Sequence, residues 1–411
     1  MTQKFDVIVV GAALNGLAAG LALGGRRARR PLCVAIVDLH DPRQKTSNGE
    51  DVRALAITAS SKRMFEALGV WENVAPHMQE MREIVVTDGN GPGARPVLLH
   101  FGDTSAEQAS AAHMVESCYL LKALLAVVEG SPNITLLTGQ AVSQQSFGPG
   151  LARLTLADGR QYSASLIVAA DGGKSPLRRA AGIETVGWSY DQMGIVATFD
   201  HMAPHGGRAE EHFMPAGPFA ILPLPGNRSS IVWTKGTAEA KRLLSLPVQD
   251  FETALETEIG SHLGNLTLVG RQQGYPLSMS VAKQFHGVRL ALVGDAAHVI
   301  HPLAGLGLNL GLRDVAALAE CVAEAYALGQ DIGGLPVLER YTTWRRFDTV
   351  ATAATMDGFN RLFSNNVPLL KNLRALGLRA TNQLTGLKKI FAKEAAGQAG
   401  VLPRLLRGEL P

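Results

Sequence analysis

The chain has 411 residues, enough for two or three domains and a sizeable core. Hydrophobic residues make up 46% and charged residues 18%, which excludes a disordered chain, and the formal net charge of +3 is too small to indicate a nucleic-acid-binding protein. Three cysteines without a CxxC pair indicate a reducing compartment, and we find no membrane-spanning run, so we expect a cytoplasmic protein.

The first forty residues predict a βαβ unit. Residues 5–10 are typical of a buried parallel strand, residues 17–24 of a helix with small side chains, and residues 32–37 of a second buried strand. The turn after the first strand reads Gly11-Ala12-Ala13-Leu14-Asn15-Gly16.

That turn is similar to the dinucleotide-binding fingerprint, with an alanine at position 13 in place of the middle glycine. Gly11 permits the tight turn, and Gly16 lets the helix approach the strand, so the N–H groups at the helix start can face a pyrophosphate. Asp38 lies 22 residues after Gly16, where an acid accepts hydrogen bonds from the adenosine ribose. The alternative interpretation is an ordinary structural turn.

Further along, we expect helices over residues 54–70 and 114–128, and strands over residues 134–137, 152–156 and 165–169. Asp171 and Gly172 follow the last of these strands. Their plain interpretation is a turn in which the aspartate binds its own backbone.

The sequence pattern changes over residues 188–285. Short alternating segments, such as residues 194–199, 219–222 and 229–234, are separated by proline and glycine. This pattern predicts an inserted antiparallel sheet, which we interpret as a substrate domain.

A third motif follows a predicted strand at residues 290–293. It reads Gly294-Asp295-Ala296-Ala297-His298 and continues through His301-Pro302-Leu303-Ala304-Gly305-Leu306-Gly307-Leu308-Asn309. A carboxylate at the tip of a buried strand, such as Asp295, can hold the ribityl chain of a flavin. Gly305 opens a predicted helix that runs to about Ala327, whose N–H groups can face the flavin N1 and C2 carbonyl.

Basic residues gather near the end of the chain. Residues 360–411 contain nine Lys and Arg against two Glu, a net charge of +7, so the remainder carries −4. Apolar residues at helical spacing between Leu369 and Phe391 predict an amphipathic helix there. Two interpretations stay open: ordinary packing with a solvated basic face, or docking on an anionic membrane or a partner.

The three motifs, in this order and at these separations, resemble the group A flavoprotein monooxygenases, the p-hydroxybenzoate hydroxylase-like flavoproteins. Within them the chain is most similar to the ubiquinone-biosynthesis hydroxylases that act on polyprenyl phenols. That narrower resemblance extends over nearly the whole chain and rests on residues 51–57, 61–63, 68–71, 217–218, 222–224, 232–234, 294–314 and 361–364.

The resemblance implies roles for single residues. It makes Arg53 a flavin-contacting arginine, Asp171 and Gly172 a second motif on the flavin or NAD(P)H side, and Asp295 the ribityl ligand. Gly294, Gly305 and Gly307 belong to the same flavin motif, in which Leu308 and Asn309 offer backbone N–H groups to the isoalloxazine and Pro302 lies beside the ring.

Two positions depart from the family pattern: Leu306 stands where glutamine is usual, and Ser117 where asparagine is usual. The first departure removes a polar group near the flavin or the substrate. His298 and His301 are candidates for handling a phenolic proton, and His301 is our candidate catalytic residue. The alternative for both is a histidine bonded to backbone near a tight turn.

The expected fold is therefore α/β, with a Rossmann-like FAD-binding domain, an inserted antiparallel β-sheet substrate domain and a C-terminal helical region. We assign residues 1–78, 106–187 and 286–350 to the first, residues 79–105 and 188–285 to the second, and residues 351–411 to the third.

The expected function is an FAD-dependent monooxygenase that hydroxylates the ring of a polyprenyl phenol in ubiquinone biosynthesis, by way of a flavin C4a-hydroperoxide. Its substrates would be O2 and a phenolic, prenylated small molecule, without nucleic acid or a metal. Because a second complete fingerprint is missing, NAD(P)H would bind transiently, or a protein donor would supply electrons. Association with the inner membrane or a quinone-biosynthesis complex would be peripheral.

Three alternatives stay open. A flavin-free NAD dehydrogenase accounts for residues 1–40 but leaves the third motif unused. The others are a different flavoenzyme, such as a prenyl-chain reductase, and a non-catalytic FAD-binding scaffold of a quinone-biosynthesis complex.

Overall fold

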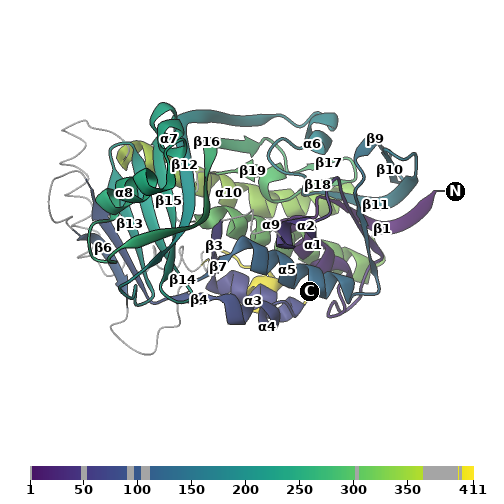
Figure 1. Ribbon diagram of the computed structural model, residues 1–411. Coiled ribbons are helices and arrows are strands. Elements are labelled where there is room, and N and C mark those ends of the chain that lie inside the picture. The colour runs from purple at the N-terminus through teal and green to yellow at the C-terminus, as the bar shows by residue number, and fades with distance from the viewer. Residues whose placement is uncertain are drawn as a thin grey trace.

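The computed structural model describes residues 2–47, 53–89, 97–102, 112–300, 305–363, 397 and 400–411. Two large β-sheets lie at opposite ends of an elongated molecule, and helices cover them (Figure 1). A three-stranded sheet lies between them. The expected fold class, a Rossmann-like domain combined with a second β-sheet domain and C-terminal helices, is confirmed.

The first large sheet holds the glycine-rich turn. Its strands are, in spatial order, β17 (His286–Gly287), β18 (Leu290–Leu292), β11 (Gln161–Ala169), β1 (Gln3–Val10), β2 (Val34–Asp38) and β8 (Ile134–Thr138). From β18 to β8 all neighbours are parallel. Two further strands, β9 (Val142–Phe147) and β10 (Ala152–Leu156), extend β11 as an antiparallel ribbon.

Helices cover this sheet closely. α1 (Leu14–Gly24) packs between α5 (Ser117–Glu129) and α9 (Leu306–Ala327). Small residues make the approach possible: a Cβ on Gly20 would lie 2.5 Å from Ile36 Cδ1 of β2. The apolar strands and helices together form the largest core of the molecule.

The second large sheet contains the inserted segment. Its strands are, in spatial order, β19 (His298–Val299), β16 (Leu266–Ala282), β12 (Thr185–His201), β15 (Arg228–Gly236), β14 (Gly217–Leu224), β13 (Arg208–Met214), β5 (Glu83–Asp88) and β6 (Val97–Gly102). The pairs are antiparallel except β13 with β5. One face, the outer face, packs on α7 (Thr237–Leu244) and α8 (Val248–Ile259) through a separate core.

Two predicted helices were wrong at their starts. Residues 54–58 form strand β3 (Ala54–Thr58), and the helix α3 (Ala59–Leu68) begins only after it. Likewise β7 (Ala112–Glu116) precedes α5. β3 and β7 pair with each other, and β4 (Gln79–Met81) completes the small sheet. Short apolar runs are ambiguous between strand and helix, and here distant pairing partners decide in favour of strand.

Several shorter elements connect these layers. They are α2 (Gln44–Ser47), α4 (Trp71–Val74), η1 (Ala75–His77), α6 (Pro176–Ala180), η2 (Gly294–Ala296) and α13 (Arg404–Arg407). The long helix α10 (Leu335–Phe363) runs alongside α9. The predicted apolar stripe from 369 to 391 lies outside the described residues, and the residue numbers of the domain boundaries stay a prediction. Within the described part of the chain, every helix is too short or too polar to cross a membrane.

Candidate functional site

The three motifs of the sequence follow three strands that are neighbours in the parallel sheet. Gly11 follows β1, Asp171 follows β11, and Gly294 follows β18, and these strands lie side by side in the order β18, β11, β1. The carboxyl ends of parallel strands meet at one edge of a sheet, where α/β folds bind ligands. The topology therefore brings all three motifs to one place.

Gly11 and Gly16 make the tight turn between β1 and α1. Gly11 has φ +111°, and a Cβ there would lie 2.2 Å from the carbonyl oxygen of Ala170. A Cβ on Gly16 would lie 1.8 Å from the carbonyl oxygen of Gly11. Neither position has room for a larger residue, so both glycines serve the packing of the turn.

The start of α1 is left open to a ligand. Ala13 is the N-cap residue, and its side chain makes no capping hydrogen bond. The first N–H groups of any helix lack partners within that helix, and a Ser, Thr, Asp or Asn cap usually satisfies one of them. The N–H groups of the first turn, from Leu14 to Gly16, are therefore available to an anionic group, and the binding of such a group here stays a prediction.

Asn15 joins the first motif to the third. A Cβ on Gly294 and a Cβ on Gly311 would each lie 2.3 Å from Asn15 Nδ2, so this side chain fills the space beside both glycines. Its Oδ1 is buried and has no hydrogen-bond partner among the described residues. The start of α1, the turn at Gly294 and the helix α9 therefore meet at one side chain.

Asp38 lies at the end of β2, as predicted, and braces the turn. Its Oδ2 accepts a hydrogen bond of 2.6 Å from the Ala12 N–H, and its Oδ1 accepts one of 2.8 Å from the His40 N–H. Each carboxylate oxygen keeps a further lone pair, so a ribose hydroxyl can still donate to it. The ribose contact stays a prediction.

Asp171 and Gly172 lie beside the first motif and reach the third. Burial raises the pKa of Asp171, opposed by hydrogen bonds from Ser175 and the Leu177 N–H. Asp171 Oδ1 has no hydrogen-bond partner within the described chain. Gly172 has φ +86° and open space where a Cβ would stand.

Arg178 ties the second motif to the third. Its Nη1 donates to the carbonyl of Ala296 at 2.7 Å, and its Nη2 donates to the carbonyl of Gly173 at the same distance. Ser175 caps the short helix that carries Arg178. The segment after β11 therefore has a structural role, because Arg178 holds the turn after β18 in place. A plain turn that binds only its own backbone explains part of this geometry and does not explain the contact with Ala296.

Asp295 lies in a hollow of the surface. Its side chain is exposed to solvent, yet protein surrounds it on most sides. This crowding raises the pKa of the carboxyl, and the nearby charges of His298 and Arg53 oppose that effect. Arg53, which is exposed, has its guanidinium carbon 5.9 Å from the ring centre of Tyr275 on β16. Arg53 therefore lies near both Asp295 of the flavin motif and Tyr275 of the second large sheet.

Beside Ala56 of β3 lies the first turn of α9. Gly305 is its N-cap residue, with φ +63° and no side-chain capping bond. Leu306, Gly307 and Leu308 follow and are partly exposed. A Cβ on Gly307 would meet no described atom within 4 Å. A second uncapped helix start therefore lies at the same site as that of α1.

Asn309 has a structural role that the sequence did not predict. Its Oδ1 accepts hydrogen bonds from the Thr58 N–H at 3.1 Å and from the Ser61 hydroxyl at 2.8 Å, and its Nδ2 donates to the Ala56 carbonyl at 2.7 Å. The side chain clamps the start of α9 to the end of β3 and the start of α3. Only the backbone of Asn309 is left to meet a flavin.

A buried charged cluster supports the turn from behind. Asp314 is fully buried and accepts from His298 Nε2 at 2.6 Å, from Arg345 Nε at 2.9 Å and from the Gly294 N–H at 3.1 Å. Burial alone would raise the pKa of Asp314, but His298 and Arg345 outweigh it and lower that pKa. This geometry favours a structural role for His298.

Sequence reasoning missed Asp314, although a signal existed: it lies three residues after Gly311, on the same face of α9. Two other predicted site residues, His301 and Pro302, lie outside the described residues. No group of three potential metal ligands occurs in the described ranges.

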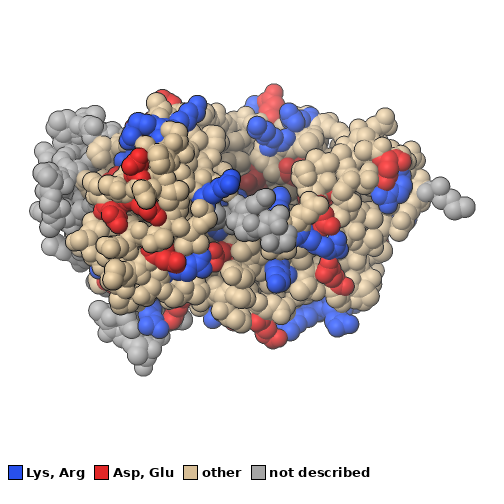
Figure 2. Space-filling view, in the orientation of Figure 1, with Lys and Arg blue, Asp and Glu red and all other residues tan. Residues whose placement is uncertain are grey.

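The residues at this edge fit a dinucleotide flavin. Two uncapped helix starts, glycines without side chains and the carboxylates of Asp38 and Asp295 gather at this edge. Figure 2 shows a hollow near the middle of the molecule, bordered by acidic and basic side chains.

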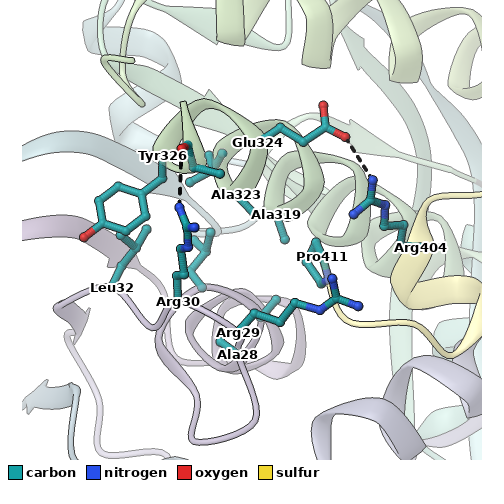
Figure 3. A pocket seen from close by; sticks show the side chains of 14 residues that line it. Ala28, Arg29, Arg30, Leu32, Ala319, Ala323, Glu324, Tyr326, Arg404 and Pro411 are labelled. Atoms are coloured by element: carbon teal, nitrogen blue, oxygen red, sulfur yellow. Dashed lines mark hydrogen bonds and ion pairs between the residues drawn. The ribbon is translucent and has the colours of Figure 1, made fainter. Parts of the chain in front are cut away.

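A second hollow, of about 240 Å³, lies away from these motifs, between the ends of α1 and α9 (Figure 3). Two of its arginines already have partners: Arg30 donates to the Ala327 carbonyl at the end of α9, and Arg404 pairs with Glu324. Cations at helix C-termini are ordinary stabilising features, so this hollow is explained without a ligand.

The chain is similar to known proteins in sequence and in fold. The FAD binding domain family matches residues 4–355. The ubiquinone hydroxylase UbiL of Rhodospirillum rubrum is 39% identical over 98% of this chain and 92% of its own length. The 3-demethoxyubiquinol 3-hydroxylase of Escherichia coli is 32% identical over 96% and 99%. The solved p-nitrophenol 4-monooxygenase PnpA from Pseudomonas putida has the same fold, with a TM-score of 0.78 and 16% identity over 98% of this chain and 100% of that one.

Proposed function

We propose a function from the premise that this chain belongs to the FAD binding domain family, among the flavoprotein monooxygenases that include ubiquinone hydroxylases. The protein is an FAD-dependent aromatic-ring hydroxylase. Its substrate is a polyprenyl phenol intermediate of ubiquinone biosynthesis, into whose ring it inserts one oxygen atom of O2.

The observation that carries this proposal is the insertion of Asn15 beside Gly294 and Gly311. It brings the two ends of a flavin dinucleotide site together, although 279 residues separate Asn15 from Gly294 in the chain. A dehydrogenase without flavin would have no use for the second uncapped helix start at Gly305.

Each motif then has a role in holding FAD. When FAD is bound, the α1 start would hold the pyrophosphate, Asp38 the adenosine ribose, and Asp295 the ribityl chain. The α9 start would hold the isoalloxazine, and its partial positive charge would favour negative charge on that ring by up to about 2 kcal/mol. Arg53 adds a positive charge from the side of β3. Bound FAD supplies the oxygen-activating chemistry.

The inner face of the second sheet, opposite α7 and α8, suits a prenylated ring. Val196, Ala220 and Val232 lie on this face, at one level of three neighbouring strands. The apolar side chains at this level bind the prenyl chain by burial and keep water from the reacting ring, and the hydroxyls of Thr198 and Ser230 lie at the next level of the same face.

The test is direct. Purified protein should be yellow, should release FAD on denaturation, and should form one hydroxylated prenylphenol per O2 consumed when it is reduced and mixed with substrate. Reduction of the prenyl chain without O2 uptake would support the reductase alternative. Bound FAD with no substrate-dependent O2 uptake would support the scaffold alternative.

The reductant is either NAD(P)H, bound transiently beside the second motif at Asp171 and Gly172, or a protein donor. Both alternatives are consistent with the sequence, because it contains one complete dinucleotide fingerprint, which FAD would occupy, and no second one for a permanently bound NAD(P)H. Stopped-flow reduction of the bound flavin by NADH, by NADPH and by a reduced ferredoxin distinguishes the two.

We also propose that the protein associates peripherally with the inner membrane or with a quinone-biosynthesis complex. The +7 charge of residues 360–411 supports this, as does a substrate with an apolar tail. Co-sedimentation with vesicles that contain phosphatidylglycerol, but not with neutral phosphatidylcholine vesicles, would support direct membrane contact. If the protein sediments with neither kind of vesicle, association with a quinone-biosynthesis complex is the alternative that remains.

A further inference from the structure

Glu211 is a carboxyl on the inner face of the second sheet. Side chains along a strand alternate between faces, so Glu211 shares its face with Ala209 and Phe213 in β13. Its partners in the neighbouring strands are Val86 of β5 and Ala220 of β14. All four neighbours are apolar.

Within the described residues, Glu211 differs from its neighbour Glu210 in having no partner. Glu210, on the opposite face of β13, is held by His212 at 3.1 Å and Arg208 at 3.2 Å. For Glu211 the described part of the chain has no hydrogen bond and no ion pair. Its side chain is half-buried, so part of it still meets solvent, although many protein atoms lie around it. Burial raises its pKa to about 7, and no charged neighbour contributes to that change.

Ala209 connects the face that carries Glu211 to the start of α9. Ala209, the residue before Glu211 on the same face, belongs to a small apolar core that Ala56 of β3 also joins. Ala56 in turn accepts the hydrogen bond from Asn309, and its Cβ lies 3.2 Å from where a Cβ of Gly305 would stand. Residues on one face of a strand are about 7 Å apart. Glu211 is therefore one such step beyond Ala209 along the inner face.

We propose that Glu211 is a catalytic residue that accepts the hydroxyl proton of the phenolic substrate. This inference rests on the proposed function. In the step, the phenol O–H bond breaks and a bond forms between the proton and a Glu211 oxygen. The electron pair of the broken bond stays on the phenolate oxygen and enriches the ring carbons ortho and para to it. The proton leaves Glu211 for solvent after product release.

The surroundings of Glu211 suit this task. A general base works best when its pKa lies near the operating pH, which an ordinary surface glutamate does not achieve. Because no described residue donates to this carboxylate, it is available to accept from the phenol hydroxyl. The aliphatic neighbours Val86 and Ala220 then contact the ring or the prenyl chain.

The first test compares Glu211→Gln with Glu83→Gln, a control on the opposite face of the adjacent strand whose side chain is 36% exposed. The FAD-loaded protein is reduced and mixed with O2 and farnesylphenol, or with a ring-fluorinated farnesylphenol whose hydroxyl is more acidic. Glu211→Gln should lower the rate with farnesylphenol about 100-fold. The fluorinated phenol should recover most of that loss, because it ionises without help, and Glu211→Asp should recover part of it. The control should match wild type.

The second test needs no turnover. Oxidised, FAD-loaded protein is titrated with farnesylphenol and with its methyl ether, which cannot donate a hydrogen bond. In wild type the preference for the phenol should increase about tenfold from pH 6 to pH 8, as Glu211 ionises and accepts a charge-assisted hydrogen bond. In Glu211→Gln the preference should not change with pH.

Equal hydroxylation rates for wild type and Glu211→Gln would overturn this inference and leave the proposed function intact. The same conclusion follows if Glu211→Gln loses the same fraction of its rate with both phenols. It also follows if the preference of wild type for farnesylphenol over its methyl ether does not change with pH. If wild type forms no hydroxylated product from any phenol, the proposed function fails as well.

Discussion

At Gly307 the stability of the fold and the binding of a flavin make opposite demands on one residue. It lies in the first turn of α9, and a Cβ there meets no described atom within 4 Å. Alanine is a better helix former than glycine by up to about 1 kcal/mol. The space beside Gly307 is, in our proposal, where the isoalloxazine lies.

We therefore predict that Gly307→Ala raises the stability of the flavin-free protein by up to about 1 kcal/mol and weakens FAD binding about tenfold or more. Urea unfolding measures the first effect, and titration of the flavin-free protein with FAD measures the second. Gly150→Ala, in an exposed turn with open space around its Cβ, is the control and should leave FAD affinity unchanged. Unchanged affinity in Gly307→Ala would place the flavin elsewhere.

A second prediction at the residue scale concerns Glu211 and the dependence of folding stability on pH. Its folded pKa is raised to about 7 from an ordinary value of 4.5, so the folded protein retains a proton that the unfolded chain has lost between these values. The stability of wild type should fall as pH rises through this window, and the full penalty should be present above pH 7.

Gln cannot ionise, so Glu211→Gln should gain stability relative to wild type between pH 4.5 and pH 8. Because the side chain is only half-buried, we expect about 1 to 2 kcal/mol. Urea unfolding midpoints of the two proteins at pH 4.5 and at pH 8 measure this gain, which should be larger at pH 8. A difference that does not depend on pH would show that Glu211 is solvated.

At the scale of elements, one buried carboxylate connects α9, α10 and the turn after β18. Asp314 on α9 accepts from Arg345 on α10 and from the Gly294 N–H in the turn. Arg345 is itself fully buried. Removing one partner from a buried ion pair leaves the other charge uncompensated, which costs more than the pair contributes.

Asp314→Asn should therefore destabilise the protein by about 3 kcal/mol or more, and should weaken FAD binding because the Gly294 turn loses its anchor. Asp348 also pairs with Arg345, at 3.0 Å, but its side chain is 27% exposed. Asp348→Asn is the matched control and should cost about 1 kcal/mol or less. Equal losses in the two variants, measured by urea unfolding, would contradict this account of the cluster.

At the scale of the whole molecule, the last residues of the chain belong to the flavin-binding half. Leu405 and Leu406 of α13 are fully buried, and α13 packs on α3 and α9, beside the chain end marked in Figure 1. Arg63 of α3 donates to the Leu406 carbonyl at 2.9 Å, and the Arg404 N–H donates to Glu320 of α9 at 2.7 Å. The chain end thus bridges two helices from distant parts of the sequence.

Leu405→Ala should cost about 2 to 5 kcal/mol of unfolding free energy, the usual loss for a buried leucine. Val401→Ala, at a residue that is 75% exposed, should change it by less than about 0.5 kcal/mol. Thermal unfolding followed by flavin fluorescence reports both, since release of FAD marks loss of the domain. A small effect of Leu405→Ala would mean that the chain end is only loosely docked.

The sequence alone determined the three motifs, their order and the fold class. Each motif depends on residues close together in the chain: a β-branched strand, glycines where a side chain would clash, and a helix start without a cap. Because the physical cause of each pattern lies in neighbouring residues, such patterns can be identified without a structure. The family resemblance rests on the same patterns.

Only the tertiary structure decided how distant residues meet. β3 and β7 are strands because they pair with each other, although their residues also suit a helix. Asn15 shows its role only beside Gly294 and Gly311, and Asn309 only beside Thr58. Glu211 is a lone carboxyl because its strand neighbours happen to be apolar. These contacts join segments up to hundreds of residues apart, and no local pattern encodes which of them will form.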